Sequence, residues 1–420
     1  MQKLTVFYSI FFFLSALYAD NLFLYKVPSS LTDTRLKTDC PMWIELGDQT
    51  LFVGDQDMAA RLPLISAPVA VNLPLYLGMS KKGTVTECLT GGKILALHDG
   101  FAVFSAPQLV IKALAITQDE HFRILPVEFG ETIVAEHQGV RLKEADPRVS
   151  SLLERISEEK VMSVVKKLVN YGTRYTTALN NGQIAIEMQA LFASFGLQSR
   201  VIEYSLWDTA VYNIEAVKKG TGNGNKKVLV VGHLDSISEK QMTDAPGADD
   251  NASGSAGVLA VAEALQGIEL EKTVIFMLFT GEEQGLKGSE DYIRKHVVMD
   301  DIEAVLNMDM IGFCSKQPGA VLLETERLAE SLVQRIATAT RTYTDLVPSI
   351  SYYAWGSDHE PFLKRNVPAV LIIEKDWAES PGYHTTKDTI DNLRGDYLVK
   401  LVRINLAALA DLAGLQQPGF

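Results

Sequence analysis

The 420-residue sequence contains only three cysteines, at positions 40, 88 and 314. So few thiols exclude a disulfide-dense scaffold and any zinc module built on four thiolates. An excess of positive charge is also absent, since 39 Lys and Arg residues stand against 52 Asp and Glu residues, a formal net charge of −13. Without a dense run of Lys or Arg, such a chain suits neither nucleic acid nor an anionic membrane surface. The composition, 47% hydrophobic and 22% charged, is that of a soluble globular enzyme or binding protein.

Long apolar runs are absent from the sequence except at its N-terminus. There, Lys3 precedes the apolar run Leu4–Tyr18, and Ala19 supplies a small residue at a plausible cleavage point. The run is shorter than the ~20 residues that a membrane-spanning helix requires. Residues 1–19 are therefore predicted to be a signal peptide, and the protein is expected to be secreted or periplasmic with no membrane partner.

Export would place the three cysteines in an oxidising environment, where an odd number leaves one thiol unpaired. Cys40 and Cys88 form the pair that we expect if a disulfide exists, because both lie in the N-terminal region. Three unpaired, buried cysteines are the alternative.

Residues 20–145 differ in pattern from the rest of the chain. Short apolar stretches alternate with turn signals such as Gly91-Gly92, which predicts a small β-rich domain. The stretches are Trp43–Leu46, Val69–Leu77, Lys93–Leu97, Ala102–Phe104 and Leu109–Ala115. A polar segment with a proline, Lys143–Arg148, then predicts a linker. Residues 20–145 are accordingly either a propeptide removed on maturation or a permanent accessory domain.

Residues 146–420 predict a second domain, in which strands and helices alternate. Two helices come first, over Ser150–Tyr171 and Ala185–Phe195. Strands are predicted at Val211–Val217, Val228–Gly232, Thr273–Phe279, Ala304–Asp309 and Ala369–Ile373. Further helices are predicted at Ser253–Leu265, Gly285–His296, Thr325–Thr340 and Asp396–Leu415. This order predicts an α/β fold with a mixed, mostly parallel sheet covered by helices. In such sheets, functional sites lie beyond the carboxyl ends of the strands.

Five motifs with possible metal ligands lie at or just past the ends of these predicted elements. Each has an ordinary structural interpretation by itself; Asp249 and Asp250, for example, could cap a helix. Together they offer two imidazoles, three ligand carboxylates and a spare glutamate. That set is what a two-metal hydrolase needs. The candidate residues are His233, Asp235, Asp250, Glu282, Glu283, Asp309 and His384.

These motifs resemble, in order and type, those of the bacterial leucyl-aminopeptidase-type co-catalytic zinc exopeptidases, metallopeptidase family 28. The resemblance covers roughly Asp146–Leu415 and implies a zinc-exopeptidase (phosphorylase/hydrolase-like) fold. It implies that Asp250 bridges two zinc ions, of which one is completed by His233 and Asp309 and the other by Glu283 and His384. It further implies that Glu282 is the general base and that the Asp235 carboxylate accepts the other ring N–H of His233 and so fixes its orientation. The segment Trp355–His359 is also similar to a family segment that shapes the site.

The resemblance implies a secreted aminopeptidase that uses a zinc-activated water. Its expected substrates are peptides with a free N-terminus, from which it releases N-terminal residues that we expect to be apolar. A carboxypeptidase or a glutaminyl cyclase on the same scaffold is one alternative, although Asp249-Asp250-Asn251 favours the two-metal peptidase over the cyclase. A noncatalytic, receptor-like binding module is another, although all five ligands are intact. Tyr352, Tyr353 and Trp355 either line a specificity pocket, assist the oxyanion or pack in the core. Side-chain preference, oligomeric state and native metal are left open.

Overall fold

The computed structural model describes residues 22–31, 37, 42–54, 62, 64–71, 74–80, 89, 92–98, 101–116, 122–127, 129, 131–136, 144–222, 224, 226–316 and 319–416. Its chain divides into two compact units, Met1–Ala135 and Glu136–Phe420, here called the N-terminal and C-terminal units. The predicted signal peptide, Cys40 and Cys88 lie outside the described residues.

The N-terminal unit is rich in β-strands, as its sequence predicts. One set of strands is ordered β9-β2-β3-β1-β4, and a separate 4-stranded sheet is ordered β6-β7-β5-β8. The strands are β1 (Leu22–Pro28), β2 (Trp43–Gly47), β3 (Gln49–Gly54), β4 (Val69–Val71), β5 (Tyr76–Ser80), β6 (Lys93–His98), β7 (Phe101–Ser105), β8 (Phe122–Pro126) and β9 (Glu131–Glu136).

Two predictions for the N-terminal unit are wrong. The stretch Leu109–Ala115 lies in a helix, α4 (Gln108–Ile116), whose Ile111 and Leu114 pack with Phe104 of β7. A continuous apolar run does not distinguish a strand from a buried helix, and leucine and alanine favour the helix. The stretch Val69–Leu77 belongs to two strands, β4 and β5, instead of one.

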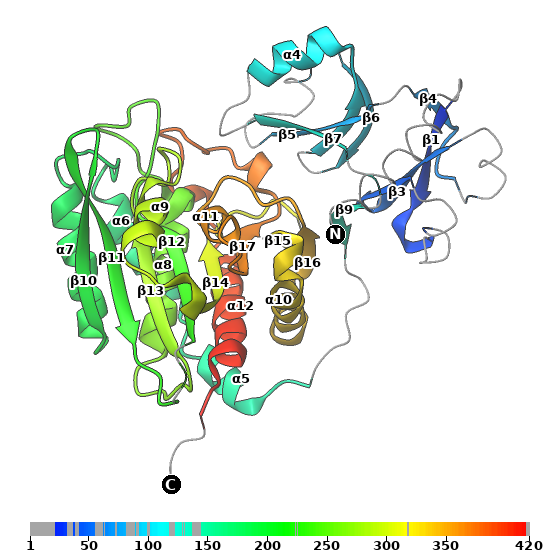
Figure 1. Cartoon of the computed structure of the whole chain (residues 1–420). Helices are drawn as coiled ribbons and strands as arrows, with labels where there is room; N and C mark the ends of the chain where they lie inside the picture. The colour runs from blue at the N-terminus through cyan, green and yellow to red at the C-terminus, as the bar shows by residue number, and fades with distance from the viewer. Residues whose placement is uncertain are drawn as a thin grey trace, which may run out of the picture. The chain divides into compact units, whose positions relative to one another are not determined.

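A mixed sheet forms the centre of the C-terminal unit, with the order β10-β11-β13-β12-β14-β17-β15-β16 (Figure 1). Strand β12 pairs in parallel with β13 and β14, and β14 pairs in parallel with β17. The carboxyl ends of these four strands therefore meet at one edge of the sheet. The strands are β10 (Gln198–Leu206), β11 (Thr209–Lys218), β12 (Lys227–His233), β13 (Thr273–Phe279), β14 (Ile302–Met308), β15 (Ala320–Glu324), β16 (Val347–Ser351) and β17 (Ala369–Glu374).

Helices cover both faces of this sheet, which confirms the predicted α/β fold (Figure 1). On one face, α7 packs on β10 and β11, while α8 and α12 pack on β12 and β14. On the other face, α9 packs on β10 and β11, and α11 packs on β17. The helices are α5 (Pro147–Leu153), α6 (Glu158–Val169), α7 (Asn181–Ser194), α8 (Gly254–Ala264), α9 (Lys287–Lys295), α10 (Glu330–Tyr343), α11 (Glu360–Leu363) and α12 (Gly395–Ala413).

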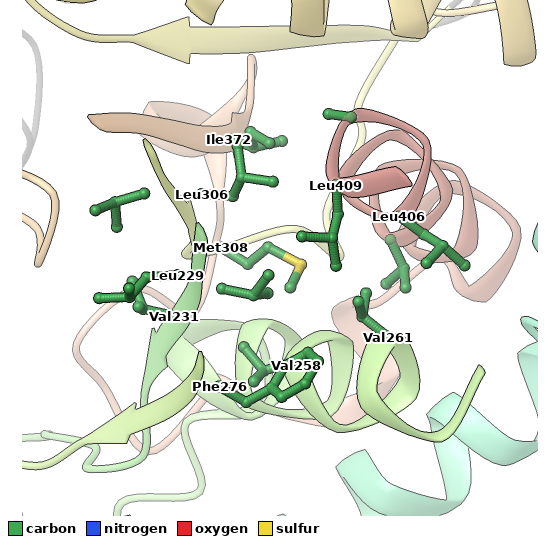
Figure 2. Packing of buried hydrophobic residues seen from close by; sticks show 14 of the residues in the cluster. Leu229, Val231, Val258, Val261, Phe276, Leu306, Met308, Ile372, Leu406 and Leu409 are labelled. Carbon is green, nitrogen blue, oxygen red and sulfur yellow. The ribbon is translucent and has the colours of Figure 1, made fainter. Parts of the chain in front are cut away.

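The main hydrophobic core fills the space between the central strands and helices α8 and α12. Leu229 and Val231 of β12 and Met308 of β14 lie beside Val258 of α8 and Leu409 of α12, all of them buried (Figure 2). Strand β12 is buried along almost its whole length. Burial on both faces is why its sequence is a continuous apolar run instead of an alternating one.

Two of the predicted helices begin or continue differently in the structure. The predicted helix Ser150–Tyr171 is two helices, because Ser157 has extended backbone angles at the start of α6. Serine is a preferred residue at this position, and the acidic first turn of α6 also favours a new helix. The predicted helix Thr325–Thr340 begins late, because Thr325 continues the sheet and its N–H donates to Ser351 O (2.9 Å).

Among the described residues, none of the helices combines the length and the apolar character that crossing a bilayer requires. Cys314 is buried and forms no disulfide; its thiol lies 3.1 Å from Lys316 O as a weak donor. The predicted Cys40–Cys88 pair stays a prediction.

Candidate metal centre

The structure brings the candidate residues together at the carboxyl edge of the central sheet. His233 is the last residue of β12, Asp309 directly follows β14, and Glu282 and Glu283 lie in the turn after β13. Asp250 lies in the irregular turn η3 (Ala248–Ser253) before α8, and His384 lies in the loop after β17. Because the four strands are parallel, side chains that are far apart in sequence converge at one place.

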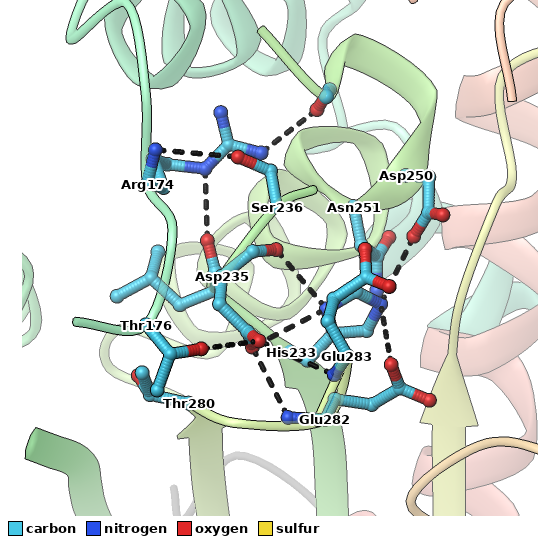
Figure 3. Close-up of polar contacts among 12 residues, drawn as sticks. Arg174, Thr176, His233, Asp235, Ser236, Asp250, Asn251, Thr280, Glu282 and Glu283 are labelled. Carbon is cyan, nitrogen blue, oxygen red and sulfur yellow. Dashed lines mark hydrogen bonds and ion pairs between the residues drawn. The ribbon is translucent and has the colours of Figure 1, made fainter. Parts of the chain in front are cut away.

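Asp250 lies between the two histidines and directs one oxygen at each. Its Oδ1 is 3.2 Å from His233 Nε2, and its Oδ2 is 3.0 Å from His384 Nε2. Each histidine also faces a second carboxylate: Asp309 Oδ1 is 3.2 Å from His233 Nε2, and Glu283 Oε2 is 3.0 Å from His384 Nε2. Figure 3 shows Asp250, Glu282 and Glu283 gathered around His233.

His233 is fully buried, and its orientation is set by main-chain geometry. Its Nδ1 lies 3.1 Å from the main-chain oxygen of Asp235 and 3.6 Å from Asp235 Oδ1. A carbonyl oxygen can only accept a hydrogen bond, so Nδ1 carries a proton. Nε2 is consequently the nitrogen that faces the carboxylates of Asp250 and Asp309, which is the arrangement of a metal-binding imidazole.

The Asp235 carboxylate fixes the turn that carries the two glutamates. Its Oδ1 accepts the N–H of Glu282 (3.4 Å), and its Oδ2 accepts the N–H of Glu283 (3.3 Å). The hydroxyl of Thr176 also donates to Oδ2 (2.8 Å). Asp235 therefore joins the end of β12 to the turn after β13 (Figure 3). Its Oδ1 also faces the His233 ring at 3.6 Å.

Asp309 is held by a chain of hydrogen bonds from the segment that the sequence singled out, Trp355–His359. The hydroxyl of Ser357 donates to Asp309 Oδ2 (2.7 Å), and Asn307 Nδ2 donates to that hydroxyl (2.8 Å). One carboxylate oxygen of Asp309 is thereby occupied, which leaves Oδ1 directed at His233.

The turn that carries Asp250 is held by Asp388. The two carboxylate oxygens of Asp388 accept the N–H groups of Asp249 and Asp250, each at 2.9 Å. The peptide bond between Asp250 and Asn251 is cis. Asn251 is buried, and its side chain donates to Met308 O (2.9 Å).

His384 is presented by a loop and is less buried than His233. Its backbone has a positive φ of 55°, and the ring of Tyr383 stacks on it with centroids 3.9 Å apart. Two residues further on, Thr386 donates from its N–H (2.9 Å) and its hydroxyl (2.8 Å) to the Glu239 carboxylate. Glu239 therefore anchors the loop from an exposed position.

The carboxylates gathered at the site favour positive charge there. Burial alone would lower the pKa of His233, but the carboxylates of Asp309 and Glu282 raise it well above its ordinary value. Burial likewise opposes protonation of His384, whereas Glu283 and Asp250 raise its pKa well above the ordinary value. Several carboxylates in a buried space thus hold two histidines in the protonated form.

The glutamates respond to the same surroundings. Burial is the main reason why the pKa of Glu282 is raised well above its ordinary value, and the neighbouring Asp309 and Glu283 add to the effect. Burial, with the charge of Asp250, raises the pKa of Glu283 to about 7. Asp250 differs: burial opposes its ionisation, but hydrogen bonds with His233 and His384 hold its pKa below the ordinary range.

These residues fit a zinc site. Imidazole nitrogens and carboxylate oxygens are ligands that zinc prefers. The candidate ligand atoms of His233, Glu282 and Asp309 lie within 4.8 Å of one another, as do those of His233, Asp250 and Glu283. The Oε1 atom of Glu283 is buried and has no hydrogen-bond partner among the described residues, so it is open to coordinate a cation.

Sequence reasoning missed several residues that hold the site. Arg174 and Thr176 come from the polar stretch after α6, where a charged residue gives no sign that it is buried. Asp388 lies inside the His384 motif but had no predicted role. A carboxylate four residues after a candidate ligand was the one signal available.

The aromatic residues near position 353 favour the packing alternative. Tyr352 belongs to the main hydrophobic core, and the guanidinium of Arg327 lies 3.8 Å from the centroid of its ring. Trp355 is buried, with its main-chain N–H donating to Glu324 Oε1 (2.8 Å). Tyr353 is half-buried.

Comparison with known sequences identifies the family. The model of peptidase family M28 matches residues 213–409. A probable leucine aminopeptidase of Trichophyton verrucosum is 31% identical over 258 residues, which are 58% of this chain and 70% of that protein. A probable leucine aminopeptidase of Arthroderma benhamiae is 30% identical with the same coverage of both chains.

Solved structures share the fold at low sequence identity. The LapA aminopeptidase of Legionella pneumophila superposes with a TM-score of 0.59 at 17% identity, covering 82% of this chain and 100% of that one. BSAP, a zinc aminopeptidase from Bacillus subtilis, superposes with a TM-score of 0.55 at 16% identity, covering 61% of this chain and 95% of that one. With histidines and carboxylates gathered at the carboxyl edge of an α/β sheet, and with these relatives, the chain belongs to peptidase family M28.

Proposed function

We propose that this metallo-aminopeptidase works with two zinc ions that share Asp250. The observation that carries the proposal is the position of Asp250, whose two oxygens lie 3.2 Å and 3.0 Å from the Nε2 atoms of two different histidines. The first half-site consists of His233, Asp309 and Asp250 Oδ1. The second half-site consists of His384, Glu283 and Asp250 Oδ2.

Glu282 is the proposed general base. When bound, zinc supplies the positive charge that activates a water molecule and polarises the scissile carbonyl. Glu282 takes the proton from the attacking water and passes it to the leaving amine. Its Oε2 lies 4.0 Å from His233 Nε2, whereas the proposed ligand oxygens of Asp250 and Asp309 lie at 3.2 Å, so Glu282 borders the ligand set without being its nearest member.

A Glu282 variant tests whether this residue acts as the base or as a metal ligand. We expect Glu282→Gln to keep both zinc ions and to lower kcat by ~100- to 10,000-fold, the usual contribution of a general base. Metal content by mass spectrometry and steady-state kinetics measure the two effects separately. Full turnover by a zinc-loaded Glu282→Gln variant would contradict the assignment, and loss of one zinc ion would make Glu282 a ligand instead.

The proposed substrates are peptides with a free N-terminus and an apolar first residue, which places the chain with the leucyl-aminopeptidase type of the family. The relatives described as probable leucine aminopeptidases support this preference. We further propose that residues 1–19 direct export of the enzyme. Residues 20–145 are proposed to be either a propeptide or an accessory domain.

A defined peptide mixture tests the reaction. The full chain is incubated with the peptides, with and without a zinc chelator, and the products are read by mass spectrometry. Peptides shortened from the N-terminus, and only without chelator, would support the proposal and reveal the residue preference. Shortening from the C-terminus would indicate a carboxypeptidase, and loss of ammonia from an N-terminal Gln would indicate a cyclase. Mass measurement of the secreted protein shows whether residues 20–145 are retained.

A further inference from the structure

Arg174 is a buried cation beside the two segments that carry His233 and Asp250. It lies in the loop between α6 and α7 and is only 3% exposed. Its guanidinium hydrogen-bonds to main-chain oxygens, and no carboxylate is among its hydrogen-bond partners in the described residues. Nε donates to Leu234 O (2.8 Å), Nη1 to Pro246 O (2.7 Å) and Leu168 O (3.3 Å), and Nη2 to Gly247 O (2.8 Å).

Three of these carbonyls belong to the two segments on which the proposed ligands lie, and the fourth, that of Leu168, belongs to α6. Leu234 is the residue between His233 and Asp235 at the end of β12. Pro246 and Gly247 lead into the turn that carries Asp250. One guanidinium therefore ties together the backbone on both sides of the His233–Asp250 contact, which is 3.2 Å long.

The close approach of this guanidinium depends on Gly247. The glycine has a positive φ of 49°, and a Cβ atom there would lie 2.9 Å from Arg174 Nη2 and would clash with the main-chain oxygen of Asp250. A side chain at position 247 would thus push both the arginine and the ligand turn away. The contact between Arg174 and the Asp250 turn therefore requires a glycine at position 247.

Arg174 remains charged in this position. Burial lowers its pKa to about 10, while the surrounding carboxylates, Asp388 and Asp235 foremost, oppose the effect. Arginine presents several donors in a rigid, planar fork, whereas lysine carries a single ammonium on a flexible stem. The fork carries its five donors on three separate nitrogens and here binds four carbonyls, whereas an ammonium has three donors on one nitrogen.

We propose that Arg174 is a positioning residue of the metal centre, which holds the His233 segment and the Asp250 turn at the separation that metal binding requires. The inference rests on the proposed two-zinc function. It assigns to Arg174 a contribution to zinc affinity through geometry, although its positive charge by itself would repel the zinc ions.

The charge of Arg174 and its hydrogen-bond geometry thus have opposite expected effects on zinc affinity, and variants can separate the two. Arg174→Lys keeps the charge and loses the fork, whereas Arg174→Gln loses both. If geometry dominates, both variants lose zinc affinity, by about 10- to 100-fold, the usual effect of a group that orients metal ligands. If charge dominates, Arg174→Gln binds zinc more tightly than the wild type, and the proposal is overturned.

Arg155→Gln is the matched control. Arg155 Nη1 also donates to two main-chain oxygens, Ala264 O (2.9 Å) and Gln266 O (2.8 Å), but at the end of α8 that points away from the site. We expect this variant to melt at a lower temperature and to bind zinc like the wild type. An equal loss of zinc affinity in the control would make the Arg174 effect one of general stability and would overturn the proposal.

Zinc affinity is measured on the full-length protein by competition with a chromophoric chelator at fixed pH, with thermal unfolding of the metal-free forms alongside. A wild type that binds no zinc would refute the proposed function itself. A wild type that binds zinc, with Arg174→Lys and Arg174→Gln unchanged, would refute only the positioning role. If Arg174→Gln does not fold, Arg174→Lys alone decides, because a folded lysine variant with wild-type zinc affinity contradicts the proposal.

Discussion

The two proposed half-sites are built from different parts of the fold. In the first half-site, His233 ends one buried strand and Asp309 follows another. In the second, Glu283 lies in a turn and His384 in a loop with a positive φ. The side chain of His233 is 0% exposed and that of His384 is 12% exposed. Asp250 is the element that they share.

The supports of the two half-sites differ in the same way. Asp309 is fixed by the buried hydroxyl of Ser357, and His233 by the main-chain oxygen of Asp235. The His384 loop is fixed by Glu239, which is exposed to water. Hydrogen bonds in a buried, low-dielectric setting hold their partners more firmly than exposed ones. We therefore expect the first half-site to bind zinc more tightly than the second.

Removing the shared ligand should have the largest effect, because it breaks both half-sites. Asp250→Ala is expected to lose both zinc ions and to reduce activity to background. Metal analysis after gel filtration and peptide hydrolysis measure this. Asp244→Ala is the control, since Asp244 is an exposed acid on the same loop. Retention of one zinc ion by Asp250→Ala would show that the half-sites are independent.

Removing one histidine at a time should separate the half-sites. His384→Ala is expected to keep one zinc ion, whereas His233→Ala is expected to lose both, because His233 orients both Asp250 and Asp309. The affinity of the affected site should fall by more than ~100-fold, since even groups that only orient ligands contribute ~10- to 100-fold. Isothermal calorimetry resolves the two binding steps. The reverse order of effects would contradict the comparison.

Proton release should accompany metal binding at both half-sites. Nearby carboxylates, acting against burial, raise the pKa values of His233 and His384 well above the ordinary value, so both carry protons at pH 7 in the metal-free protein. Zinc must displace these protons, and its affinity therefore rises with pH and falls as the solution is acidified. The binding enthalpy at pH 7 should depend on the ionisation enthalpy of the buffer. An enthalpy that is the same in all buffers would rule this out.

Loosening the His384 loop should have the smallest effect and should be confined to the second half-site. Glu239→Gln weakens the hydrogen bonds from Thr386, which we expect to lower the affinity of the weaker zinc ion only severalfold, because Glu239 is exposed to water. Titration of the protein that already holds one zinc ion measures it. Glu303→Gln, which removes an ion pair with Lys272 at the start of β14, serves as control. Equal weakening of both zinc ions by Glu239→Gln would contradict a role limited to the second half-site.

Much of the site could be predicted from the sequence because its ligands follow continuous apolar strands. Strand β13 spans Thr273–Phe279 as predicted, and the two glutamates follow it at once. The carboxyl ends of parallel strands meet, so this alone places His233 near Asp309. The hydrogen bonds that Arg174 and Ser357 donate and that Asp388 accepts could not be predicted, since each joins segments that no local pattern connects.

The sequence by itself determined the fold class and the chemistry of the ligands. Buried strands require continuous apolar runs, and the histidines and carboxylates at the ends of several such runs together form the donor set of a zinc site. Only the tertiary structure decided which oxygen faces which nitrogen. That Asp250 divides its two oxygens between His233 and His384, and that Arg174 binds carbonyls from both flanking segments, depends on residues far apart in the chain. Their separation is set by the packing of the sheet, which no single segment encodes.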